Sequence, residues 1–202
     1  GMTIPDPLLT KEHGLPNACT RCHGDKSVDW AIEWTDKWYG LRMNRPTRQR
    51  ARVLARLQKN DATAVTEAIK QLSQERNGTW RAAYLKLLMP WVTDSRNPQL
   101  RQTVQQVMLD RLQDSEPLAQ AAAIDALEPL GETVADRLTP LLQAPYRLVR
   151  LKAAWVLRHR VDLQSPVGQE LSAMLAYSLD QPTGAFRWAN YLNEAGKPKE
   201  SL

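Results

Sequence analysis

A helical unit that recurs along the chain constrains the fold more than any other feature. Three segments align with one another: GTWRAAYLKLL (78–88), EPLAQAAAIDAL (116–127) and YRLVRLKAAWVL (146–157). Three polar side chains fall in register in this alignment, at offsets of 39 and then 30 residues: Arg81, Gln120 and Arg150. Self-similarity at a period of a few tens of residues is typical of repeat architectures.

Each aligned segment is preceded by another amphipathic stretch, at 63–74, 98–113 and 133–143. Apolar residues recur at three- and four-residue spacing, and alternating β-branched runs are absent, which predicts helices and no strands. The pattern resembles HEAT repeats, whose second helix opens with an Asp-Pro-like turn and an arginine and then has an alanine-rich face. We therefore predict an all-α protein built as a HEAT-like α-solenoid of helix pairs.

Turn signals divide the chain. Pro and Gly are dense in residues 1–26, which predicts an irregular, extended arm, and Ser27 is placed to cap a short helix over about 28–39 that Gly40 ends. Later breaks are predicted at Asn77-Gly78, 94–98, 114–117, Gly131, Ala144-Pro145, Ser165-Pro166 and Gln181-Pro182.

We predict three parts along the chain. Residues 1–60 hold the arm, a tryptophan-bearing helix and a basic helix, residues 61–161 hold the HEAT-like repeats, and residues 162–202 hold a terminal, tetratricopeptide-like helix pair. That last pair stops before a second helix is complete, and Gly1 before Met2 is typical of a residue left by a purification tag. These features indicate either a fragment of a longer protein or a chain that has lost its export signal, and the sequence leaves both open.

The composition excludes several classes. Hydrophobic residues make up 43% and charged residues 24%, as in ordinary globular proteins, and the net charge of +5 mildly favours acidic partners. No apolar run approaches the ~20 residues that cross a bilayer, and residues 2–16 lack the apolar core of a secretory signal. The glycines are scattered, so no phosphate-binding loop is present, and no hydrolytic constellation appears.

The stretch NACTRCHG (17–24) contains the only two cysteines of the chain. Cys19, Cys22 and His23 form a C-x-x-C-H, the attachment signature of c-type haem. Two thiols add across the two vinyl groups, the two intervening residues let both sulfurs reach one porphyrin edge, and the adjacent imidazole supplies the proximal iron ligand. A zinc site would need four ligands, and a thioredoxin-like motif would lie among strands. A metal or disulfide role, and a motif without a role, stay open.

The segment from residue 8 to residue 40 strengthens this interpretation. It resembles part of the multihaem c-type cytochromes related to the cytochrome c554 family, on these residues: Pro16-Asn17-Ala18, Cys19, Cys22, His23, Asp25-Lys26-Ser27, Trp30-Ala31 and Trp38-Tyr39-Gly40. The resemblance implies haem c and a periplasmic or extracytoplasmic electron-transfer protein, rather than a stand-alone enzyme. Its partner would be a redox protein or the remainder of a multihaem cytochrome. Protein made in the cytoplasm is expected to lack the haem.

Further candidates surround this motif. The sixth iron ligand could come from His13, ten residues before His23, or from His159 or Met43, although a solvated histidine or a packing methionine is the simpler interpretation of each. Three tryptophans share one helix face at i, i+4 and i+8: Trp30, Trp34 and Trp38. They are expected to form a core stripe against the first helix pair, to wall one side of the haem, or to do both.

The stretch from Arg42 to Lys59 is basic and contains no acidic residue. It is either a solvated helix face, a set of partners for haem propionates, or a phosphate-binding surface of the kind by which HEAT-like solenoids grip DNA. Interleaved aromatics, which single-strand binders use, are missing. The leading hypothesis is electron transfer through haem with the solenoid as a protein-docking scaffold. The alternative is a haem-free HEAT-like module that binds protein or nucleic acid.

Overall fold

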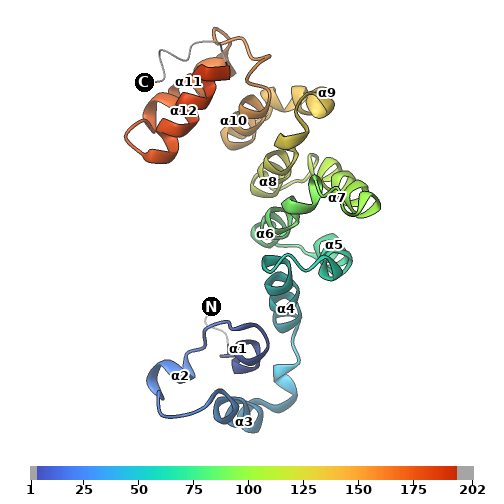
Figure 1. The fold of residues 1–202 in the computed structure, drawn as a ribbon, viewed down its shortest axis with the longest axis vertical. Helices are drawn as coiled ribbons and strands as arrows, with labels where there is room; N and C mark the ends of the chain where they lie inside the picture. Colours follow the sequence, from blue (N-terminus) through green and yellow to red (C-terminus); the bar gives the residue numbers. More distant parts are fainter. Residues whose placement is uncertain (1–3, 195–202) are drawn as a thin grey trace. The chain divides into compact units, whose positions relative to one another are not determined.

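The computed structural model describes residues 4–194, and within them all regular structure is helical, as predicted (Figure 1). The chain divides into two compact units, residues 1–74 and residues 75–202. The boundary falls between two helices that the repeat pattern paired, α5 (Val65–Gln74) and α6 (Gly78–Leu88). The last helices belong to the same unit as the repeats.

The N-terminal arm is not irregular, and that prediction was wrong. It contains α1 (Pro7–His13) and the single-turn α2 (Cys19–Cys22). Pro7 occupies the first helical position, where its missing N–H is not needed. Gly14 ends α1 with φ 74°, a left-handed conformation that glycine adopts without a steric cost. The Pro and Gly signals that predicted a loop act here as the start and stop of a helix.

The rest of the first unit follows the predicted boundaries closely. In α3 (Val28–Tyr39), the hydroxyl of Ser27 accepts a hydrogen bond from the Trp30 N–H at 3.1 Å, and Gly40 ends the helix, so the predicted caps are confirmed. A 3-10 turn, η1 (Gly40–Met43), leads to α4 (Pro46–Gln58), and another, η2 (Ala62–Ala64), leads to α5. Because α1 packs against both α3 and α4, the arm is an integral layer of this unit.

The second unit contains the repeated segments. The three aligned stretches form α6, α8 (Pro117–Leu127) and α10 (Arg147–Val156), and α8 packs between the other two. Figure 1 shows these helices in one layer, with α7 (Pro98–Arg111) and α9 (Ala135–Leu138) in another. Then α11 (Pro166–Tyr177) packs on α10, and α12 (Pro182–Glu194) on α11. Residues 195–202, the end of the predicted terminal segment, lie outside the described residues.

The register of the repeat has a structural basis. Arg81 donates to the carbonyl oxygens of residues 75 and 76, at 3.3 and 2.9 Å, and Arg150 donates to those of residues 144 and 145, at 2.8 and 3.1 Å. The carbonyls lie six and five residues earlier in both cases. Gln120 donates to the carbonyl of residue 112 at 2.6 Å. The aligned side chains therefore satisfy carbonyls in the turn that precedes each helix, which would otherwise lack partners.

Small residues let the helices of this layer approach closely. Ala121, Ala122 and Ala123 of α8 and Ala153 and Ala154 of α10 are all buried, as the alanine-rich pattern predicted. A methyl group in place of a larger side chain brings neighbouring helix backbones together at native packing density.

The predicted helix over 133–143 is shorter than expected. After Gly131, whose φ is 50°, η4 (Glu128–Val134) leads to the four-residue α9, and η5 (Thr139–Gln143) follows. Pro140 has no N–H to donate to the carbonyl of residue 136, so the α-helical ladder cannot continue through it. The backbone tightens into 3-10 geometry instead.

Candidate functional site

The C-x-x-C-H motif forms a single helical turn. Because α2 places residues three apart on the same side, Cys19 and Cys22 share one face of this turn. His23 ends it, and its N–H donates to the carbonyl oxygen of Cys19 at 2.9 Å. Both thiols are free; Cys19 is half-buried, and Cys22 and His23 are exposed. The sulfurs and the imidazole are therefore accessible to one ligand.

A cavity of about 260 Å³ lies between this turn and α3. Its walls combine the motif with one face of the tryptophan helix: Ala18, Cys19, Cys22, His23, Trp30, Ala31, Trp34, Thr35 and Trp38. The structure thus brings together all the sequence-predicted haem-binding residues of the motif and of the tryptophan stripe.

The aromatic rings form a continuous row along the cavity. Ring centroids lie 5.1 Å apart for His23 and Trp30, 6.4 Å for Trp30 and Trp34, and 5.4 Å for Trp34 and Trp38, the spacing of favourable aromatic pairs. The buried positions of α3 are Ala31 and Thr35, whereas Trp30 and Trp34 are half-buried and Trp38 is 62% exposed. The stripe therefore lines the cavity with rings that are only partly covered.

Asn17 couples α1 to the motif. Its side chain is buried, with Oδ1 accepting from the Thr20 N–H at 3.1 Å and Nδ2 donating to Thr10 Oγ1 at 2.8 Å. The first contact caps α2, and the second fixes the cap to α1. Sequence reasoning named Asn17 only as part of a resemblance. An Asn shortly before a short helix is the signal from which its capping role could have been predicted.

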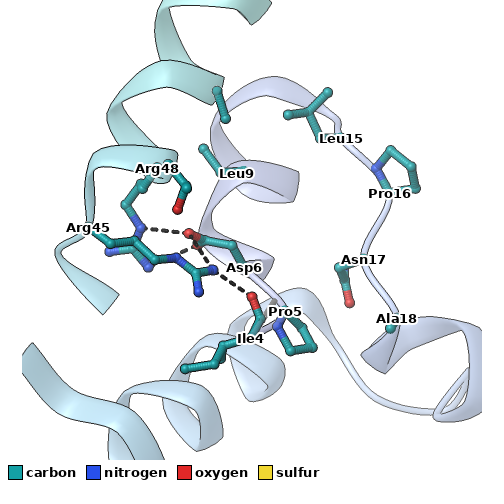
Figure 2. Close-up of a pocket in the computed structure, with 12 residues that line it drawn as sticks. Ile4, Pro5, Asp6, Leu9, Leu15, Pro16, Asn17, Ala18, Arg45 and Arg48 are labelled. Carbon is teal, nitrogen blue, oxygen red and sulfur yellow. Dashed lines mark hydrogen bonds and ion pairs between the residues drawn. The ribbon is translucent and has the colours of Figure 1, made fainter. Parts of the chain in front are cut away.

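Ion pairs fasten the arm to the basic helix. Arg48 donates from Nε and Nη2 to both oxygens of Asp6, at 2.8 and 2.9 Å, and Arg52 does the same to Glu12, at 2.7 Å in each case. Figure 2 shows Arg45 and Arg48 converging on Asp6, with Arg45 also donating to the Ile4 carbonyl at 2.5 Å. Two-point contacts of this kind fix orientation as well as distance. Sequence reasoning missed these pairs because the partners are some forty residues apart.

These contacts change the interpretation of the basic stretch. Arg45, Arg48 and Arg52 are engaged with the arm, and Arg56 donates to Asp61 at 2.8 Å and to Thr63 at 2.6 Å. The bond from Thr63, followed by that from Arg56, lowers the pKa of Asp61 to about 2. A phosphate or propionate would have to displace a carboxylate from each of these guanidinium groups.

The other candidate iron ligands do not line the cavity. His13 ends α1 with its Nε2 3.7 Å from a Glu12 oxygen, and Met43 is fully buried as a packing residue. His159 lies in the second unit, exposed, 3.5 Å from Glu194. Among residues 4–194, no three His, Cys, Asp or Glu side chains gather as a metal-binding group. None of the described helices has the length and apolar character to span a membrane.

The residues present fit a covalently attached haem. The fit rests on two accessible thiols on one side of a helical turn, an imidazole directly after them, and a wall of indoles that can exclude water from a porphyrin face. No family model, curated protein or solved structure matches this chain. The function is therefore argued from the geometry of the site.

Proposed function

We propose that this protein transfers electrons through a c-type haem attached to Cys19 and Cys22, with His23 as the proximal ligand. The observation that carries the proposal is the shared cavity, in which both thiols and the imidazole face a row of three indoles. When bound, the haem supplies one-electron redox chemistry. This proposal includes the relation to multihaem cytochromes of the cytochrome c554 type and a periplasmic or extracytoplasmic location, where such haem is attached.

The residues of the motif and of its surroundings would have separate roles in attaching and orienting the haem. Each cysteine would add its S–H across one vinyl group, giving a thioether with the proton on the neighbouring carbon. The turn-ending position of His23 sets its imidazole beside the Trp30 ring at 5.1 Å, which limits its rotation. Asn17 holds the turn on α1 through its two hydrogen bonds. His13, the sequence candidate for the sixth ligand, ends that same helix but does not line the cavity, so the structure gives that role no support.

The second unit would act as the docking scaffold. Its layer of α6, α8 and α10, with an equivalent Arg or Gln at the start of each helix, supports a HEAT-like solenoid. Its partner would be a redox protein or the remainder of a multihaem cytochrome. Nucleic-acid binding through Arg42–Lys59 loses support because Arg45, Arg48 and Arg52 already bind the arm. A salt-sensitive shift of DNA on a native gel would revive that alternative.

The test is haem attachment in a competent host. The chain is exported behind a signal peptide in cells with cytochrome c maturation, alongside a Cys19→Ser/Cys22→Ser control. We expect a Soret band that survives acid–acetone extraction in the parent chain and is absent from the control. Folded, exported parent protein without thioether-linked pigment would refute the proposal. Cytoplasmic protein is uninformative because haem is not attached there.

A further inference from the structure

Two cavities of the second unit join into one groove. One, of about 350 Å³, is lined mainly by α6 and α8 and reaches α10, and the other, of about 390 Å³, is lined mainly by α10 and reaches α6, α8, α11 and α12. Both are lined by Lys86, Asp125, Leu148 and Lys152, so they are continuous. The groove therefore crosses the layer formed by the repeated helices.

The floor of the groove is apolar. Alanines at 82, 83, 121 and 122 line the first cavity, and Leu151, Trp155 and Met174 line the second. Leu118 and Leu148 stay 47% and 41% exposed at its edge, and each lies two residues before its aligned polar residue, Gln120 or Arg150. Large apolar side chains left exposed beside a concave apolar floor are typical of a surface that another molecule covers.

The acidic side chains of the groove have partners of opposite charge, whereas two of its cationic side chains have no such partner in the described part of the chain. Its two acidic residues have cationic partners within the protein: Asp125 accepts from Lys152 at 2.8 Å, and Glu128 lies 3.4 Å from the Arg158 guanidinium and also accepts from the indole N–H of Trp155 at 2.8 Å. Its other two cations, Lys86 and Arg187, make no hydrogen bond or ion pair with any residue of the described range 4–194. The uncompensated charge is therefore positive, and it favours a ligand with carboxylates.

The spacing of the two cavities suits an extended ligand. The lining of the first cavity is concentrated on α6 and α8 and that of the second on α10, so the two are offset by about one helix, roughly 8–10 Å for packed helices. In a polyproline II segment, side chains at i and i+3 point the same way and lie about 9 Å apart, because the rise is ~3.1 Å per residue with three residues per turn. Two apolar side chains of such a segment would each enter one cavity.

We propose that this groove binds an acidic segment of a partner protein in the polyproline II conformation, with apolar anchors at i and i+3. The inference rests on the proposed docking role of the second unit and names its binding face and the chemistry of its partner. A nucleic acid suits the groove less well, because three cations beside two acids on an alanine floor offer few phosphate contacts. The groove is complete without haem.

The test uses the haem-free full chain and labelled synthetic seven-residue peptides, with binding followed by fluorescence anisotropy. The peptides carry two leucines spaced by two, three or four positions, with prolines between them and either glutamates or lysines around them. We expect the glutamate peptide with spacing three to bind most tightly and to weaken as salt is raised. Lys86→Glu and Arg187→Glu should each weaken it about fivefold and favour the lysine peptide instead.

The matched control is Arg137→Glu on α9, an exposed arginine outside the groove, which should leave the affinity unchanged. Circular dichroism confirms that each variant is folded. The proposal is overturned if no peptide binds, if lysine peptides bind as well as glutamate peptides, or if the groove variants behave like the control. Haem attachment is scored separately, so failure of either proposal leaves the result of the other intact.

Discussion

The buried ion pair between Arg81 and Asp114 should be a major support of the second unit. Arg81 donates to both carboxylate oxygens, at 3.0 and 2.7 Å, and its side chain is 10% exposed against 2% for Asp114. Asp114 also accepts from the Glu116 N–H at 2.9 Å and lies 3.3 Å from the Arg111 guanidinium. We predict that Arg81→Met, which keeps most of the apolar stem, destabilises this unit strongly.

The magnitude follows from what remains around the carboxylate. Removing one member of a buried pair costs about 3–5 kcal/mol because the other charge is left uncompensated. In Arg81→Met, Asp114 still accepts from the Glu116 N–H and still lies beside Arg111, so we expect a loss at the lower end of this range, about 3 kcal/mol. The total free energy of unfolding of a typical domain is about 5–15 kcal/mol. The double variant Arg81→Met/Asp114→Asn, which also removes the negative charge, should have a free energy of unfolding about 1–2 kcal/mol higher than Arg81→Met alone.

The same pair predicts a pH dependence. Burial tends to raise the pKa of Asp114, but the Arg81 hydrogen bond, the Glu116 N–H and the nearby guanidinium charges outweigh it and hold that pKa below the ordinary 3.8. The pair therefore stabilises the native protein above about pH 4, and that stability is lost as pH falls below this value. Without Arg81, burial raises the pKa, so the cost of Arg81→Met should be largest near neutral pH and should shrink in acid.

Urea unfolding followed by circular dichroism measures this cost, with a matched control within the chain. Arg96 makes the same two-point contact with Asp94, at 2.9 and 3.0 Å, but its side chain is 84% exposed. Arg96→Met should therefore lower the free energy of unfolding far less than Arg81→Met does, because solvent screens this pair. Equal losses for Arg81→Met and Arg96→Met would refute the argument that burial sets the value of these pairs.

Two further predictions concern close packing and the arm. A Cβ at Gly168 would lie 2.1 Å from the carbonyl oxygen of Asp162, so Gly168→Ala should lower the free energy of unfolding in urea by about 2–3 kcal/mol. A Cβ at Gly24 would have no atom within 4 Å, so Gly24→Ala is the control and should leave that free energy unchanged. The hydrogen bond from Arg52 holds the pKa of Glu12 below 4.5, so this contact stabilises the arm above that pH and is lost as pH falls through the range below it. NMR signals of α1 amides near Glu12 should shift across that acid range, and the midpoint of this shift should move to higher pH in Arg52→Met because the lowering hydrogen bond is gone; an unchanged midpoint would contradict the role of the pair.

The local structure of this chain was largely predictable because its signals are local. The spacing of apolar residues predicted the helices, and turn signals and the Ser27 cap predicted their boundaries. In the structure Ser27, Asn77 and Ser165 each cap the helix that follows them. The exceptions are also local in origin. Pro140 shortens a predicted helix, and Pro7 with Gly14 starts and stops a helix that was predicted to be a loop.

Within the candidate site, the sequence supplied the residues and the tertiary structure supplied their arrangement. Three tryptophans at four-residue spacing must share a helix face, whichever side of α3 the protein covers. Only packing showed that this face lines the same cavity as Cys19, Cys22 and His23.

The sequence by itself determined that the chain is helical, where most helices begin and end, and that two thiols and an imidazole lie within five residues of one another. Only the tertiary structure decided that the arm is fastened by Asp6 and Glu12 to arginines forty residues later, and that a groove with a net positive charge crosses the second unit. The physical reason is range. Helix periodicity and capping depend on neighbours within about four residues, whereas ion pairing and groove formation depend on which distant surfaces are packed together.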